Sequence, residues 1–332
     1  MSNTDDPDRS DRQGSGGRHG RRGRHGRRGP RRGRRGEQLM VPEAEFSSYY
    51  GKPVIKAPSW AARDIAGYFF LGGLAGAGSV LAAGAHVAGR GRMATALKVS
   101  SLTAVSLSAA ALVHDLGRPG RFVNMLRVIK PTSPMSVGSW LLSAYGPAAG
   151  VAVTGRLPRA GTAATCTAAA LGPAIAAYTG VLAADTAVPA WHGVHRELPY
   201  LFTASATAAA AGMALVTAPT RENGPARRAA VLAAGADAYL MRAAEQRLGI
   251  VAETWRDGRA GRLLRASRAL VACGAATGAL LGHHRSAATL SGLALLGGSA
   301  CTRFGVFAAG VASAEDPKYT VVPQRERAHQ DA

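Results

Sequence analysis

The stretch HDLGRPGRFVNMLRVIKPTSPMSVGSW, residues 114–140, decides the fold predicted for this chain. It is charged, it is interrupted by proline, and it lies between two long apolar runs. Four runs contain no Asp, Glu, Lys, Arg or His: residues 65–85, 131–155, 160–184 and 198–220. Each is at least as long as the roughly 20 residues that a helix needs to cross a hydrocarbon core of about 30 Å. The quoted stretch is therefore predicted to be a loop at a membrane boundary.

The mean hydropathy of +0.02 averages a polar N-terminal segment with an apolar body. Residues 1–36 contain twelve Arg and four Asp, with no aliphatic residue beyond Met1. Such a segment cannot bury enough apolar surface to offset its chain entropy. We therefore expect residues 1–58 to be a disordered Arg/Gly-rich tail and lead-in. Residues 37–56 separate the basic segment from the first apolar run, which argues against a secretory signal.

The basic tail has three interpretations. Clustered guanidinium groups attract nucleic-acid phosphate, but no aromatic residue is interleaved to stack on bases, so we do not expect nucleic acid as a partner. The tail can instead contact anionic lipid or set the topology. It can also be an extension without function, since Met40 offers a second start. Translocating twelve Arg is disfavoured, so both termini are expected in the cytoplasm, with the chain in the plasma membrane.

The apolar pattern predicts an all-α integral membrane protein with about eight transmembrane helices between residues 60 and 315, followed by a C-terminal tail, 316–332. The small residues Gly72, Gly76 and Ser79 share one helical face, where a neighbouring backbone can approach closely. The sixth span is the weakest, because Asp237, Arg242 and Glu245 interrupt it; a surface amphipathic helix is the alternative. The expected spans are residues 61–87, 94–113, 136–155, 160–184, 199–217, 227–248, 266–283 and 286–312.

The chain offers no ligand set for a redox centre. Its three cysteines lie in apolar runs without metal-ligand spacing, and we interpret them as small buried apolar side chains. Its histidines lie near the ends of the expected spans, not opposite each other within them. We therefore expect no haem, iron–sulfur cluster or metal in this chain, so that redox chemistry would depend on a partner.

Polar groups close to apolar spans are costly and are candidates for function. Asp64 and Tyr68 are four residues apart at the start of the first span, and Tyr178 and Asp185 are seven apart at the exit of the fourth. In an eight-span topology both pairs lie near the same membrane face. A tyrosine hydroxyl and a carboxylate supply the hydrogen bond and the proton transfer that a quinone needs. The alternative is that the tyrosines are interfacial and the aspartates cap helices.

The charged loop has a similar double interpretation. Asp115 either pairs with Arg118 and fixes the turn before Pro119, or extends a path for protons. Arg303, within the last span, is interpreted as an ion-pair partner of Asp237 or Glu245.

The same residues resemble the NrfD-like family, the membrane subunits of polysulfide reductase and related molybdenum–iron–sulfur oxidoreductases. The resemblance covers about residues 60–320, and its loop motif is more specific than its glycine-rich span. The motifs that carry it are Tyr68-Phe-Phe-Leu-Gly-Gly-Leu-Ala-Gly, Asp115-Leu-Gly-Arg-Pro with Arg121-Phe, Lys130-Pro-Thr-Ser-Pro-Met-Ser with Gly138-Ser-Trp140, Tyr178-Thr-Gly, Val188-Pro-Ala-Trp191 and Asp316-Pro-Lys-Tyr-Thr-Val-Val-Pro-Gln324.

The resemblance implies that the first four spans form a bundle that binds menaquinone or menaquinol. Tyr178 and Tyr68 are the implied quinone contacts, and Asp64 is the further candidate that its spacing to Tyr68 suggests. Proton handling is implied for Asp115, Asp185 and His86. Arg118, Arg121 and Trp191 would lie where a partner docks; Trp191 is also a natural interfacial anchor.

The function implied by this resemblance is a membrane anchor that passes electrons between the quinone pool and a docked ferredoxin-like four-cluster iron–sulfur subunit. A molybdopterin subunit, of polysulfide reductase or formate dehydrogenase type, would complete the catalytic complex. The alternative class is a transporter of small solutes or ions, which would favour inverted repeats and broken helices near the midplane. We find no internal repeat in the sequence.

Overall fold

The computed structural model describes residues 54–55, 58, 60–115, 120–127, 129–154 and 158–330, and the predicted basic tail lies outside them apart from three isolated positions. The described residues form helices and connections, with no strand among them. In chain order the elements are α1 Ala62–Val87, α2 Gly91–Asp115, α3 Gly120–Leu126, α4 Pro134–Val153, α5 Pro158–Ala184, α6 Pro189–His192, α7 Leu198–Thr217, α8 Gly224–Leu248, the 3₁₀ helix η1 Gly249–Ala252, α9 Glu253–Arg256, α10 Gly258–Leu281, α11 Arg285–Glu315 and α12 Lys318–Gln330.

The all-α membrane fold expected from the sequence is confirmed. Each of the eight expected spans coincides with one long helix. Five of these helices, α1, α2, α5, α7 and α11, are long and apolar enough to cross a membrane. α8 and α10 carry more charged residues than such a helix, and the Gly, Ser and Pro residues of α4 lower its hydropathy. The number of helices that cross the membrane thus stays a prediction.

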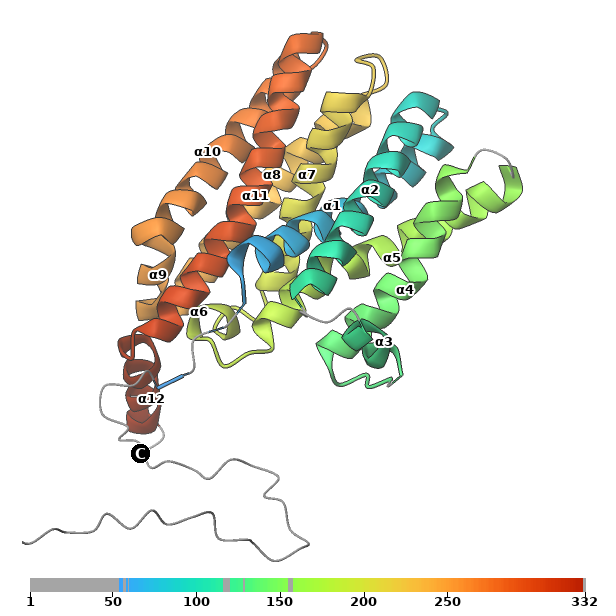
Figure 1. Ribbon diagram of the computed structural model, residues 1–332. Coiled ribbons are helices and arrows are strands. Elements are labelled where there is room, and N and C mark those ends of the chain that lie inside the picture. The colour runs from blue at the N-terminus through green and yellow to red at the C-terminus, as the bar shows by residue number, and fades with distance from the viewer. Residues whose placement is uncertain are drawn as a thin grey trace, which may run out of the picture. The chain divides into compact units, whose positions relative to one another are not determined.

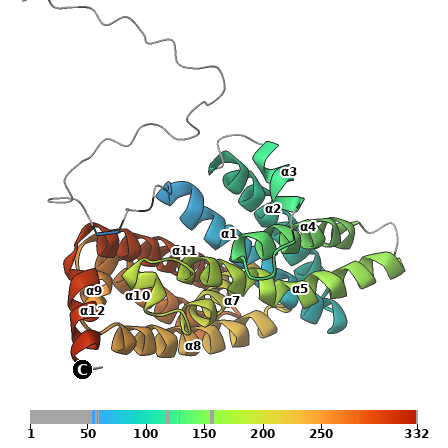
Figure 2. The ribbon, with the colours of Figure 1, turned by 90° about the horizontal axis from the view of Figure 1, so that it is seen from below.

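The long helices lie side by side, and the connecting elements α3, α6, α9 and α12 gather at one end (Figure 1). We call this the α6 end. α1 packs against α2, α5, α7 and α11, while α10 packs mainly on α11. Viewed from the α6 end, α7 lies between the group of α8, α10 and α11 and the group of α4 and α5 (Figure 2). The connections that follow α2, α5 and α8 therefore lie at the same end of the helices.

Glycine sets the closest helix crossings. A Cβ atom on Gly76 of α1 would lie 2.4 Å from the carbonyl oxygen of Gly172 on α5. A Cβ atom on Gly212 of α7 would lie 2.6 Å from the carbonyl oxygen of Gly292 on α11. Both distances are shorter than any ordinary contact, so each crossing requires glycine. The expectation that Gly76 lies on a face of close approach is confirmed.

Two local expectations are corrected. Cys166 and Cys273 are exposed on the helix surface and Cys301 is half-buried, so the thiols are not the buried side chains we expected. Exposed positions on membrane helices can contact lipid tails, so a small apolar side chain there need not be buried in the protein. Residues 120–126 form the short helix α3 inside the segment that was expected to be a loop.

Candidate functional site

Tyr68 and Tyr178 meet in the interior of the helices. Tyr68 belongs to α1 and is 1 % exposed, and Tyr178 belongs to α5 and is 8 % exposed. Their hydroxyl groups are hydrogen-bonded to each other, and their rings meet edge to face with centroids 6.3 Å apart. Two hydroxyls hold two hydrogen atoms, and the bond between them uses one. The second can be donated to a ligand, so this pair is the centre of the candidate site.

Gly138 on α4 makes room for Tyr178. A Cβ atom at this position would lie 2.1 Å from the Tyr178 ring. The ring therefore rests directly against the backbone of α4. Gly138 was part of a sequence motif, but no role was predicted for it.

Tyr145 is a buried polar group that the sequence analysis missed. Its hydroxyl donates to the carbonyl oxygen of Ala75 at 2.6 Å and contacts Ser79 Oγ at 2.6 Å. It follows Gly138 by seven residues, two turns of α4, so both face the same side of that helix. This spacing was the available signal. Tyr145 joins α4 to α1 beside the glycine crossing and is a structural residue of the site.

Asp64 lies one turn before Tyr68, near the α6 end of α1. Its carboxylate is 3.2 Å from Nδ1 of His114, the penultimate residue of α2. The Asp64 side chain is 22 % exposed and the His114 side chain 78 % exposed. The pair thus connects the first turn of α1 with bulk water. No role was predicted for His114 from the sequence.

The three residues expected to handle protons do not lie at the same end of the helices. Asp115 ends α2 and is half-buried, and Asp185 follows α5 and is exposed, both at the α6 end. His86 lies in the last turn of α1, where its Nε2 is 3.3 Å from Thr162 Oγ1. Eighteen residues of helix separate it from Tyr68, about 27 Å at 1.5 Å per residue. His86 therefore does not join the other candidates.

The expected docking residues are only partly described. Arg118 lies outside the described residues, and Arg121 lies on α3. Trp191 is 1 % exposed, stacks on Trp60 with centroids 5.9 Å apart, and donates from Nε1 to the carbonyl oxygen of Val306 at 2.7 Å. It thus packs in the core, because its loop folds back between the helices as α6, and it offers no exposed surface to a partner.

No three His, Cys, Asp or Glu side chains gather into a metal-binding group within the described residues. The tyrosine hydroxyls and the carboxylates at the site can form hydrogen bonds and transfer protons.

Comparison with known proteins supports the resemblance. A family model described as polysulphide reductase, NrfD, matches residues 58–154. No curated protein matches the chain. The matched range holds Tyr68, Asp115, Gly138 and Trp140, whereas Tyr178 and the motif around Trp191 lie beyond it. With the five long apolar helices, the match indicates a membrane protein whose residues 58–154 are similar to the polysulphide reductase, NrfD family, as the motifs of its first spans predicted.

Proposed function

We propose that this chain is the quinone-reactive membrane subunit of a polysulfide reductase-like complex. The observation that carries the proposal is the meeting of Tyr68 and Tyr178, from two different helices, against the backbone at Gly138. A quinone carbonyl oxygen accepts hydrogen bonds, and this pair has a hydroxyl hydrogen to donate. The surrounding apolar helices suit a ligand that enters from the bilayer.

The chain's own groups would handle protons as the quinol is oxidised or the quinone reduced. Two protons accompany the two electrons. Asp64 and His114 connect the first turn of α1 with water, and Asp115 and Asp185 lie at the same end. We assign proton exchange to these carboxylates, because an ionised carboxylate accepts a proton that a tyrosine hydroxyl releases. His86 has no part in this route.

Electrons would pass through the α6 end. The resemblance implies an iron–sulfur subunit docked close to the quinone, and Tyr68 and Asp64 lie toward this end of α1. We place the docking surface on α3 and the neighbouring exposed loops, with Arg121 within α3. A molybdopterin subunit would complete the complex beyond it. Menaquinone is the proposed ligand.

The test is Tyr178→Phe in the assembled complex. This substitution keeps the ring against Gly138 and removes one hydroxyl. Losing one hydrogen bond in a buried site costs about 1–3 kcal/mol. Quinone-linked turnover or quinone affinity should then fall roughly five- to hundredfold. Asp185→Asn should instead slow proton-coupled turnover with little change in quinone affinity, because the amide keeps the shape but cannot take a proton.

Tyr200→Phe is the matched control. Tyr200 lies on α7 and is 68 % exposed, so the same chemical change there should leave quinone-linked turnover unaltered. Wild-type turnover in Tyr178→Phe would refute the site and return Tyr178 to a packing role.

A further inference from the structure

A second polar site lies in the other half of the protein, between α8 and α10. A cavity of about 480 Å³ opens there, lined by Ala234, Asp237, Ala238, Arg242, Glu245, Gln246, Arg256, Arg268, Val271 and Ala272. Five of these residues are charged. Charged groups this close to apolar helices are costly and are candidates for function.

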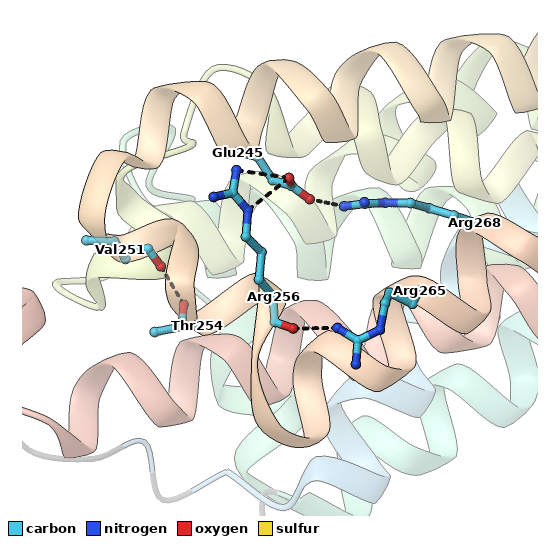
Figure 3. A network of polar contacts seen from close by, with 6 residues as sticks. All are labelled: Glu245, Val251, Thr254, Arg256, Arg265 and Arg268. Carbon is cyan, nitrogen blue, oxygen red and sulfur yellow. Dashed lines mark hydrogen bonds and ion pairs between the residues drawn. The ribbon is translucent and has the colours of Figure 1, made fainter.

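Glu245 of α8 connects α9 and α10 at the exposed opening of the cavity. Its carboxylate forms ion pairs with Arg268 of α10 and, at 3.4 Å, with Nε of Arg256 at the end of α9 (Figure 3). Arg265 donates to the carbonyl oxygen of Arg256 at 2.6 Å and fixes that turn. The spacing of Arg242 and Glu245, three residues apart, allows a pair within α8. The tertiary structure supplies two partners from other elements instead.

Among the charged side chains that line the cavity, exposure decreases from Arg256 to Asp237, whereas Ala238, next to Asp237, and Ala272 in the same lining are exposed. The side chains of Arg256 and Arg268 are 61 % and 43 % exposed, and that of Glu245 is 13 % exposed. Asp237 is 2 % exposed. Eight residues separate Glu245 from Asp237, about 12 Å along the helix. The cavity thus leads from a water-exposed mouth at the α6 end to a carboxylate near the middle of α8.

The carboxylate of Asp237 is incompletely partnered. Its Oδ1 atom is buried and makes no hydrogen bond within the described part of the chain. The charged groups around it are Arg303 of α11, Arg268 of α10, and Arg242 and Glu245 of α8 itself, while the neighbouring α7 carries no charged residue. A buried oxygen of this kind requires a hydrogen-bond donor, because leaving it bare costs about 1–3 kcal/mol.

Arg303 of α11 interacts electrostatically with Asp237 and is not part of the cavity lining. Its guanidinium is fully buried, donates from Nη2 to the carbonyl oxygen of Phe202 at 2.5 Å, and lies 3.8 Å from the centroid of the Phe202 ring. The Phe202 ring is in turn 5.7 Å from that of Phe69, the neighbour of Tyr68. Arg303 is therefore a fixed positive charge between the cavity and the tyrosine pair.

We propose that Asp237 is a proton-exchange site, reached by water from the α6 end and separate from the tyrosine pair. A carboxylate oxygen only accepts hydrogen bonds, so the occupant must be a donor. The three arginine side chains around the cavity repel a metal cation. A proton delivered by water neutralises the Asp237 carboxylate and leaves no additional cation beside the arginines. A hydronium ion in the cavity donates its proton to one carboxylate oxygen of Asp237 and becomes a water molecule. No electron is transferred in this step. The proposal does not rest on quinone binding.

Infrared spectroscopy of the purified full chain in lipid nanodiscs tests the site without any activity. On lowering the pH, a carbonyl stretching band at the frequency of a protonated carboxyl group in apolar surroundings should grow, separate from the band of the exposed carboxyl groups, and Asp237→Asn should lack it. In deuterated water the band should shift within the time of solvent exchange, because the cavity is open to water. Asp257→Asn, which changes an exposed aspartate at the same end, should keep the band.

Dicyclohexylcarbodiimide provides a second measurement on the wild-type chain. This apolar reagent modifies protonated carboxyl groups in apolar surroundings, so peptide mass spectrometry should find the adduct on Asp237 and not on the exposed Glu253. An infrared band that persists in Asp237→Asn would overturn the proposal. So would the absence of an adduct on Asp237 at every pH, even if Tyr178 proved to bind quinone.

Discussion

At the scale of single residues, Gly138 shows how the site depends on a missing side chain. The Tyr178 ring occupies the space that a Cβ atom at residue 138 would need, so the contact between the two tyrosine hydroxyls depends on this glycine. A methyl group there must displace either the ring or α4. The position of Tyr178 is thus decided by a residue forty positions earlier in the chain.

Gly138→Ala should therefore destabilise the protein by about 1–3 kcal/mol, the usual range for an overpacked interior. Thermal unfolding in detergent is the measurement. Gly146→Ala, in the same helix, is the control, because nothing lies within 4 Å of the added methyl group. Equal melting temperatures for the two variants would contradict the packing described here.

At the scale of elements, pairs of helices pack together at positions where only glycine fits. α1 and α5 cross at Gly76 and Gly172, where the carbonyl oxygen of one chain segment fills the place of a side chain on the other. The crossing holds the two helices that carry Tyr68 and Tyr178. Helix packing and site geometry are therefore coupled.

Gly76→Ala should separate α1 from α5 and weaken both folding and the tyrosine contact. We expect a lower melting temperature and a reduced yield of folded protein. Gly84→Ala, two turns further along α1, provides the comparison, since an added methyl group meets nothing within 4 Å there. A Gly76→Ala protein as stable as Gly84→Ala would show that the helices can move apart without cost.

The C-terminal helix α12 is held by an ion pair at the α6 end. Lys318 Nζ donates to a carboxylate oxygen of Glu253 at 2.7 Å, and this hydrogen bond lowers the pKa of Glu253. Because the folded-state pKa is lower than the unfolded one, the pair stabilises the docked helix above the usual glutamate value of about 4.3 and loses its effect as the pH falls through the lowered value. The groups are exposed, so the contribution is small.

Protection of the amides of residues 318–330 against hydrogen exchange, after correction for the intrinsic pH dependence of exchange, should therefore decrease on acidification. In Lys318→Met this protection should already be lower at neutral pH and should depend less on pH. The same steep dependence in this variant would mean that another group holds α12.

For the whole molecule, the orientation in the membrane stays a proposal, with the α6 end in the cytoplasm. α10 offers a direct test, because Asp257 precedes its first residue and the exposed His283 follows its end. In a background without native cysteines, His283→Cys should react with a membrane-impermeant thiol reagent in intact cells. Asp257→Cys should react only after the cells are permeabilised. The reverse pattern would invert the topology.

The sequence by itself determined the helical membrane fold and the residue types of the candidate site, but not every helix boundary, since α10 begins at Gly258, eight residues before the expected span. Charge-free runs of sufficient length specify helices because no other backbone structure satisfies its hydrogen bonds locally in lipid. The spacing of Asp64 and Tyr68 on one face likewise follows from helix periodicity alone.

Only the tertiary structure decided which of these residues meet. Tyr68 and Tyr178 are 110 positions apart. Their contact depends on the crossing of α1 and α5 at Gly76 and on the fit of the Tyr178 ring against Gly138, and no local pattern reveals the partners of these glycines. Trp191 looked like a surface anchor, yet the fold of its loop buries it against Phe307. Glu245 found its arginine partners on α9 and α10, and not on its own helix, because contacts between helices depend on how their backbones pack together and not on spacing along one of them.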